Sequence, residues 1–110
     1  MILPFNPQDW VIRLPVRIFS PAQQTIVLMA LDTGASTSAI SGSIATFLGY
    51  DIDAFETDIE LVTLSASTHI RRFIVSRIEL QEHQLLNFPM LCYTDVDLPG
   101  IDGVLGLDFL

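Results

Sequence analysis

The sequence predicts a mainly β fold in a single domain, built from antiparallel strands with one or two short helices. The chain has 110 residues, a common size for one domain, and 50% of them are apolar, so a core can form without disulfide bonds. Several runs of strand length alternate apolar with polar residues, and polar turns separate these runs. This pattern indicates strands that pair with their neighbours along the chain.

Composition disfavours several classes of partner. The formal net charge is -8, and every positive charge is an arginine, which disfavours binding to nucleic acid or to an anionic membrane surface. The first ten residues lack the pattern of a signal peptide, and no apolar run is long enough to span a bilayer. We therefore expect a soluble, cytoplasmic protein with no nucleic-acid partner and no membrane partner.

The lone cysteine, Cys92, excludes a disulfide within the chain. It lies in the apolar run Pro89–Tyr93, which predicts a buried strand rather than a reactive thiol with basic neighbours. A reducing compartment is the expectation.

The first third of the chain predicts a β-hairpin. Residues 1–7 are expected to form an extended arm, and residues 10–18 a half-buried strand with Arg13 and Arg17 on its polar face. A turn at Ser20–Gln23 leads to a return strand at Gln24–Leu31. The side chains expected to face inward from the first strand are Trp10, Ile12, Leu14, Val16 and Ile18.

Asp32 follows the apolar run Ile26–Ala30, with only Leu31 between them. This run is apolar enough for burial on both faces, and a carboxylate beside it is costly unless it is compensated or used. The small residues of 33–38 predict a tight loop whose N–H groups converge on the carboxylate, with Gly34 where the backbone approaches closely. A short helix is expected at Ile44–Leu48, ending at Gly49.

The rest of the chain predicts a second hairpin and further strands. An acidic loop at 50–56 precedes strands at 57–64 and 70–80, which are joined by a turn at Ser65–Thr68. A turn at 81–84 leads into a strand at 85–94, where Pro89 is tolerated only at an edge or bulge. An acidic loop is expected at 95–102. Residues 103–110 are expected to form a buried strand, a glycine and the first turn of a helix. The predicted sheet is thus a meandering antiparallel one.

Two motifs together resemble those of the retropepsin-like (retroviral-type) aspartic protease family. One is Leu31-Asp32-Thr33-Gly34-Ala35 after an apolar strand, and the other is the stretch Gly103–Leu110. The resemblance implies one closed β domain of the acid-protease type over residues 1–110, with Asp32 as the catalytic residue. It further implies that Thr33, Gly34 and Ala35 form a supporting loop and that Val104, Leu105 and Gly106 form a motif beneath the site. The implied substrate-binding and flap residues are Ser36, Ser65, Ala66, Ser67 and Thr68.

The implied activity is that of an aspartic endopeptidase acting on peptides or unfolded proteins. Two carboxylates held close together share one proton, so one serves as base toward a water and the other as acid. The chain has one Asp-Thr-Gly, so the second carboxylate must be Asp32 of another subunit, and a homodimer with the site on its two-fold axis is implied. No metal and no cofactor is expected.

The sequence departs from the retroviral pattern in several places. Ser36 and Leu107 stand where an Asp and an Arg commonly stabilise the site and the dimer, and the flap turn has Ser65, Ala66 and Ser67 in place of glycines. With Leu110 as the last residue, the dimer is expected to be weak or built without the usual C-terminal strand. Because Ala35 replaces the Ser that hydrogen-bonds the carboxylate in the pepsin type, we expect the pH optimum of activity to be nearer mildly acidic than strongly acidic pH.

Other interpretations stay open beside this one. The chain could be a catalytically inactive retropepsin-fold module for peptide binding or dimerisation, and Asp32 could simply open an ordinary turn. The spacing of Asp95, Asp97 and Asp102 lacks the ligand pattern of a calcium loop, so a solvated acidic loop is expected. His69 and His83 are expected at the surface without zinc, and the serines Ser36, Ser38, Ser41 and Ser43 form no nucleophile-elbow pattern.

Overall fold

The computed structural model describes residues 12–62, 67–94 and 98–110, and for residues 57–62 and 67–69 it describes the backbone alone. The expected arm at residues 1–7, together with Trp10, lies outside the described residues, as do Ser65, Ala66, Asp95 and Asp97. No helix among the described residues is long and apolar enough to cross a bilayer.

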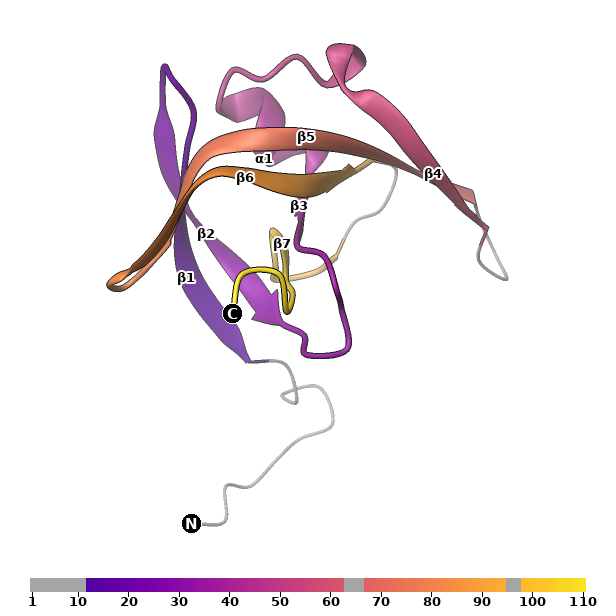
Figure 1. Cartoon of the computed structure of the whole chain (residues 1–110). Coiled ribbons are helices and arrows are strands. Elements are labelled where there is room, and N and C mark those ends of the chain that lie inside the picture. Colours follow the sequence, from indigo (N-terminus) through magenta and orange to yellow (C-terminus); the bar gives the residue numbers. More distant parts are fainter. Residues whose placement is uncertain (1–11, 63–66, 95–97) are drawn as a thin grey trace.

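The fold is a closed β-barrel with little helix (Figure 1). The strand order is β1-β2-β7-β3-β6-β5-β4, and an extra pairing between β1 and β5 closes a ring that leaves β4 outside. The mainly β, closed fold class is therefore confirmed. The elements are β1 (Arg13–Phe19), β2 (Gln24–Leu31), β3 (Ala39–Ser41), α1 (Gly42–Phe47), the 3-10 helix η2 (Ile52–Ala54), β4 (Glu56–Val62), β5 (Ser67–Leu80), β6 (His83–Tyr93) and β7 (Gly103–Leu105).

Two short strands depart from a purely antiparallel meander. β7 runs parallel to β2, and β3 runs parallel to β6, while β3 and β7 pair antiparallel with each other. These strands have three residues each, too few to carry an alternating pattern. Their insertion between β2 and β6 joins the two ends of the chain into one sheet.

The β1–β2 hairpin forms where the sequence predicts it, with Phe19 paired to Gln24. Ser20 shapes the turn: its N–H donates to Gln23 O (2.8 Å), and its hydroxyl donates to Leu48 O (2.6 Å). The expected burial of the Ile26–Ala30 run on both faces is wrong, because Ile26 and Leu28 are exposed on the outside of the barrel. Ile12, expected to face inward, is also exposed.

Helix α1 starts two residues before the predicted Ile44 and ends before Gly49, as expected. Ser41 caps its N-terminus, with the side-chain oxygen accepting the N–H of Ile44 (3.4 Å). Gly49 has a φ of +93°, a left-handed conformation that glycine adopts without strain. The acidic loop at 50–56 contains the short helix η2, which sequence periodicity did not indicate.

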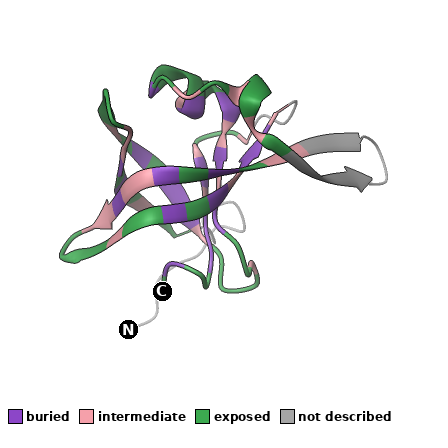
Figure 2. Cartoon of the chain, turned by 45° about the horizontal axis from the view of Figure 1, so that its top comes forward, coloured by how far each residue is buried: buried purple, intermediate pink, exposed green. Residues whose placement is uncertain are grey.

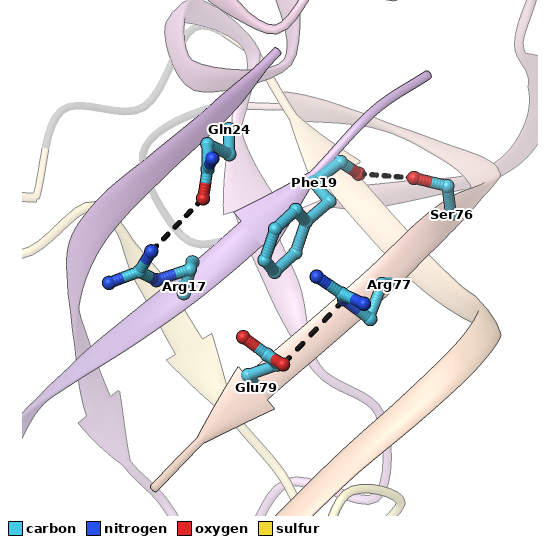
Figure 3. Close-up of polar contacts among 6 residues, drawn as sticks. All are labelled: Arg17, Phe19, Gln24, Ser76, Arg77 and Glu79. Atoms are coloured by element: carbon cyan, nitrogen blue, oxygen red, sulfur yellow. Dashed lines mark hydrogen bonds and ion pairs between the residues drawn. The ribbon is translucent and has the colours of Figure 1, made fainter. Parts of the chain in front are cut away.

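Polar contacts stabilise the seam where β1 meets β5 and the barrel closes (Figure 3). Ser76 donates its hydroxyl hydrogen to Phe19 O (2.9 Å), and the guanidinium of Arg77 lies 3.9 Å from the centroid of the Phe19 ring. The hydroxyl of Tyr50 also donates to Phe19 O (2.9 Å). Because these contacts converge on one residue of β1, the ring closes with a defined register.

Pro89 occupies an open edge of β6, as the sequence predicts. It pairs with Ile74 of β5 on one side. On the other side Leu91 donates its N–H to Ser38 O (2.9 Å), and β3 begins only at this level. Pro89 lies two residues before Leu91, where β6 has not yet paired with β3. Its missing N–H therefore costs no hydrogen bond of the ladder.

The core lies inside the barrel, where alternate side chains of the strands are buried (Figure 2). A second aromatic group under η2 adds Phe55 stacked on Phe73, with ring centroids 4.5 Å apart. At the C-terminal end, Phe109 and Leu110 donate their N–H groups to the carbonyls three residues earlier. These residues therefore form a hydrogen-bonded turn and not the predicted start of a helix. The buried core residues are Val16, Ile18, Val27, Met29, Ile40, Ala45, Leu48, Phe73, Val75, Ile78, Phe88, Met90, Cys92, Leu105 and Phe109.

Cys92 lies fully buried in β6, as predicted. Its burial raises the pKa of the thiol from 9.0 to about 11, although the positive charge of Arg71 acts to lower it.

We predict that a thiol reagent labels Cys92 of the native protein only as fast as the protein unfolds. Above pH 9 the unfolded thiol ionises first, so the unfolded state binds fewer protons and stability falls as the pH rises toward 11. The rate of labelling measured in increasing urea tests the first expectation, and fast labelling of the native protein contradicts it. In Cys92→Ala, the fall in stability that the thiol causes above pH 9 should disappear.

Candidate active site

Asp32 stands at the point where β2 leaves the sheet, and backbone bonds fix its position. The N–H of Leu31 donates to Ile12 O (2.8 Å), and the N–H of Asp32 donates to Leu105 O (3.0 Å). Leu31 pairs with Leu105 in the parallel β2–β7 ladder. The backbone at Asp32 is thus held from both sides, while its carboxylate is exposed rather than buried.

The loop after Asp32 folds back on the carboxylate. Gly34 donates its N–H to Asp32 Oδ1 (2.9 Å), and Ala35 donates its N–H to Asp32 O (3.1 Å). A Cβ atom on residue 34 would lie 3.2 Å from Asp32 Oδ1, so glycine lets the N–H approach without crowding. This geometry suits an ordinary Asp turn as well as a catalytic loop, so the loop's chemistry must be judged from its surroundings.

The stretch that begins at Gly103 lies directly beneath this loop. Leu107 donates its N–H to Ala35 O (2.9 Å). A Cβ atom on Gly106 would lie 2.8 Å from Ala35 O, closer than real Cβ atoms come to other atoms, and 3.0 Å from the carbonyl carbon of Thr37. A glycine at 106 is therefore required for the loop to rest on β7.

Ser38 and Asp108 form a hydrogen-bond network under the loop that sequence reasoning missed. Ser38 is fully buried, and its Oγ accepts the N–H of Gly106 (2.9 Å) and donates to Asp108 Oδ1 (2.6 Å). The N–H of Ser38 also donates to the Asp108 carboxylate, at 2.9 Å from Oδ2. The two residues are 70 positions apart, and a serine and an aspartate near glycines are read from sequence as turn formers.

The structure joins some of the predicted site residues and leaves others apart. Asp32 is hydrogen-bonded to Leu105, and Ala35 lies against Gly106. Val104 pairs with Ala30 and Ala39 of the neighbouring strands, and Thr33 and Ser36 are exposed. Of the predicted flap, Ser65 and Ala66 lie outside the described residues. Ser67 and Thr68 open β5 and pair with Val62 and Leu61 of β4, in a hairpin that projects from the barrel (Figure 1).

A pocket of about 450 Å³ adjoins the Ser38–Asp108 network. Thr37 and Asp108 line one part of it, and the open edge of β6 supplies an apolar wall. The remaining lining residues are Arg72, Phe88, Pro89, Met90 and Leu91. The pocket therefore offers an apolar surface bounded by two charged side chains beside the Asp32 loop.

Other titratable residues have structural roles. Asp102, expected in a solvated loop, accepts the N–H of Leu28 at its Oδ2 (3.0 Å). His83 is exposed, as expected, and its Nε2 lies 2.7 Å from Phe109 O. Within the described residues, no group of three His, Cys, Asp or Glu side chains could hold a metal ion.

Comparisons with known proteins agree with this geometry. Residues 14–109 match the model of a protein family described as aspartyl protease. The fold is similar to that of a retropepsin-like aspartic protease from Rickettsia conorii, with a TM-score of 0.71 and 16% identity over 94% of this chain and 78% of that one. A search of curated proteins gave no significant match.

Two further solved structures share the fold. The retroviral protease-like domain of Ddi1 from Leishmania major has a TM-score of 0.61 and 20% identity, covering 89% of this chain and 73% of that one. The EIAV protease, complexed with the inhibitor HBY-793, has a TM-score of 0.66 and 20% identity, covering 96% of this chain and 89% of that one. At these identities the likeness establishes the fold.

The Ser38–Asp108 network makes a prediction about stability. Ser38→Ala removes the acceptor of the buried Gly106 N–H, so we expect the free energy of unfolding to fall by about 1–3 kcal/mol. Ser43→Ala, at an exposed serine of α1, is the matched control and should change it by less than about 0.5 kcal/mol. Urea unfolding measures both, and equal effects of the two substitutions contradict a stabilising role of the network.

Proposed function

We propose, from the premise that this chain belongs to the retropepsin-like aspartyl protease family, that it is an endopeptidase active as a homodimer. The observation that carries the proposal is the placement of Asp32. Its carboxylate is exposed on a loop whose backbone is fixed by Leu105, Gly106 and the Ser38–Asp108 network. A side chain that is open to substrate yet held in place is what acid–base catalysis demands.

The proposed reaction uses Asp32 of both subunits. Two carboxylates within hydrogen-bond reach share one proton, because both cannot be ionised at that separation. The ionised Asp32 takes a proton from a water molecule, and the resulting oxygen attacks the peptide carbonyl carbon. The protonated Asp32 donates to the carbonyl oxygen, and the amine leaves after it is protonated.

The substrate we propose is an extended peptide or an unfolded protein. The chain carries one Asp-Thr-Gly, so each subunit supplies half of the site. The β4–β5 hairpin, which pairs with the barrel through β5 alone, is the element we expect to close over the peptide. We expect an extended substrate to lie between this hairpin and the Asp32 loop, because an extended peptide can add to an open strand edge.

Asp32→Asn tests the proposal directly. The amide keeps the shape of the side chain but can neither take up nor release the proton, so cleavage of an unfolded protein should fall at least about 100-fold. Asp53→Asn, at an exposed aspartate of η2, is the matched control and should leave cleavage unchanged. A pepstatin-like inhibitor should block the wild-type enzyme.

Cleavage by Asp32→Asn at the wild-type rate contradicts the assignment. A wild-type dimer that binds peptide and cleaves nothing supports the alternative, a catalytically inactive retropepsin-fold module for peptide binding or dimerisation.

A further inference from the structure

Arg13, the first residue of β1, is an exposed arginine close to the end of β2 that carries Asp32. We propose that Arg13 determines substrate specificity, by binding the carboxylate of a Glu or Asp residue near the scissile bond of the peptide. The inference rests on the proposed function and names the substrate class that the same site prefers. That class is an extended peptide with an acidic residue close to the point of cleavage.

Arg13 belongs to a row of residues that crosses the sheet next to Asp32. It pairs with Ala30 of β2. Val104 of β7 pairs with Ala30 on one side and with Ala39 of β3 on the other. Residues that lie opposite each other in neighbouring strands place their side chains on the same face of the sheet. The row therefore has a cation at one end and smaller, apolar side chains beside it.

Asp32 lies within reach of this row. It follows Ala30 by two residues, and side chains two residues apart along a strand share a face. Two residues span about 7 Å along a strand and neighbouring strands are about 5 Å apart, which puts the Cα atoms of Arg13 and Asp32 about 8 Å from each other. A peptide whose carbonyl is attacked at Asp32 therefore passes close to the long side chain of Arg13.

The guanidinium of Arg13 reaches across β2. The position that a Cβ atom would take on Gly100 lies 3.6 Å from Arg13 Nη2 and 3.8 Å from its Nε. Gly100 belongs to the loop before β7, and this loop bonds to the edge of β2 that faces away from β1, since Asp102 donates its N–H to Leu28 O (2.7 Å). The Arg13 side chain consequently extends over β2 at the level of the buried Ala30.

Arg13 differs from other arginines of the chain in its lack of a polar partner. Arg17 donates to a glutamine oxygen of β2 (3.0 Å), Arg71 donates to a backbone carbonyl of η2 (3.0 Å), and Arg77 lies 3.6 Å from a glutamate of β5. Within the part of the chain that the structure describes, the Arg13 guanidinium has no hydrogen-bond acceptor and no ion pair. Its N–H donors are thus available to a ligand.

An acidic residue near the scissile bond needs such a cation. A pair of Asp32 carboxylates that shares one proton carries a negative charge, and each chain has a formal net charge of -8. A carboxylate on the peptide is repelled there unless a positive charge lies next to it. A guanidinium is always ionised and binds a carboxylate through two parallel hydrogen bonds, so Arg13 can turn this repulsion into attraction.

The test compares cleavage by the wild type, Arg13→Gln, Arg13→Glu and Arg17→Gln. Arg17 is the matched control, because it is an exposed arginine on the same face of β1 whose guanidinium is already bonded. Cleavage sites in a library of unfolded peptides are read by mass spectrometry. For the wild type and Arg17→Gln we expect Glu or Asp to be enriched within about three residues of the scissile bond, the length of peptide that Arg13 can reach. Arg13→Gln should show no such enrichment.

Matched peptides measure the size of the effect. A short peptide from the library that carries Glu is compared with a twin that carries Gln at the same position. In the wild type and Arg17→Gln, kcat/KM should be about fivefold higher for the Glu peptide, the upper end for an ion pair that stays partly in water. In Arg13→Gln the two peptides should be cleaved equally, and Arg13→Glu should prefer a twin that carries Lys.

Two results overturn the assignment of Arg13 while the proposed function stands. One is cleavage by the wild type without a preference for Glu, or with the same preference in Arg13→Gln. The other is a dimer dissociation constant, measured by analytical ultracentrifugation, that rises at least about tenfold in Arg13→Gln but not in Arg17→Gln, since Arg13 then pairs with the second copy. A wild type that cleaves no peptide in the library defeats the proposed function, and this inference with it.

Discussion

The hydrogen bond from the N–H of Asp32 to Leu105 O joins the two parts of the chain on which the site depends. It is made by a three-residue strand, β7, which lies between β2 and β3. The chain packs closely around this strand: a Cβ atom on Gly103 would overlap Ala39 O of β3, and one on Gly106, the residue after β7, would lie 2.8 Å from Ala35 O of the Asp32 loop. The two glycines are thus a steric condition for the position of Asp32.

Ser38 extends this constraint to the far side of the loop. Its N–H and O–H donate to Asp108, its Oγ accepts from Gly106, and its carbonyl accepts the N–H of Leu91. A fully buried serine with these partners meets the rule that buried polar groups are paired, and it couples the loop to β6. The Asp32 loop is consequently tied to several elements, while β4 pairs with β5 alone.

Local patterns in the sequence predicted the parts of the fold that local interactions determine. The β2 strand and the Ser20–Gln23 turn matched the prediction because alternation and a turn signal act over a few residues. The parallel pairings of β3 and β7 were not predictable, since three residues carry no periodicity. Hydropathy also could not tell that the outer face of β2, with Ile26 and Leu28, stays open.

The Asp32 loop was recognisable from its motif, whereas its support was not. Ser38 and Asp108 meet across 70 positions and show no charge or spacing pattern that links them. The measurement that tests the central claim most directly is the distance between the two Asp32 carboxylates in a crystal structure of the dimer. The account predicts oxygens within about 3 Å of each other, as in a pair that shares a proton. A dimer whose two Asp32 carboxylates lie beyond hydrogen-bond reach, with no shared site between them, would contradict it.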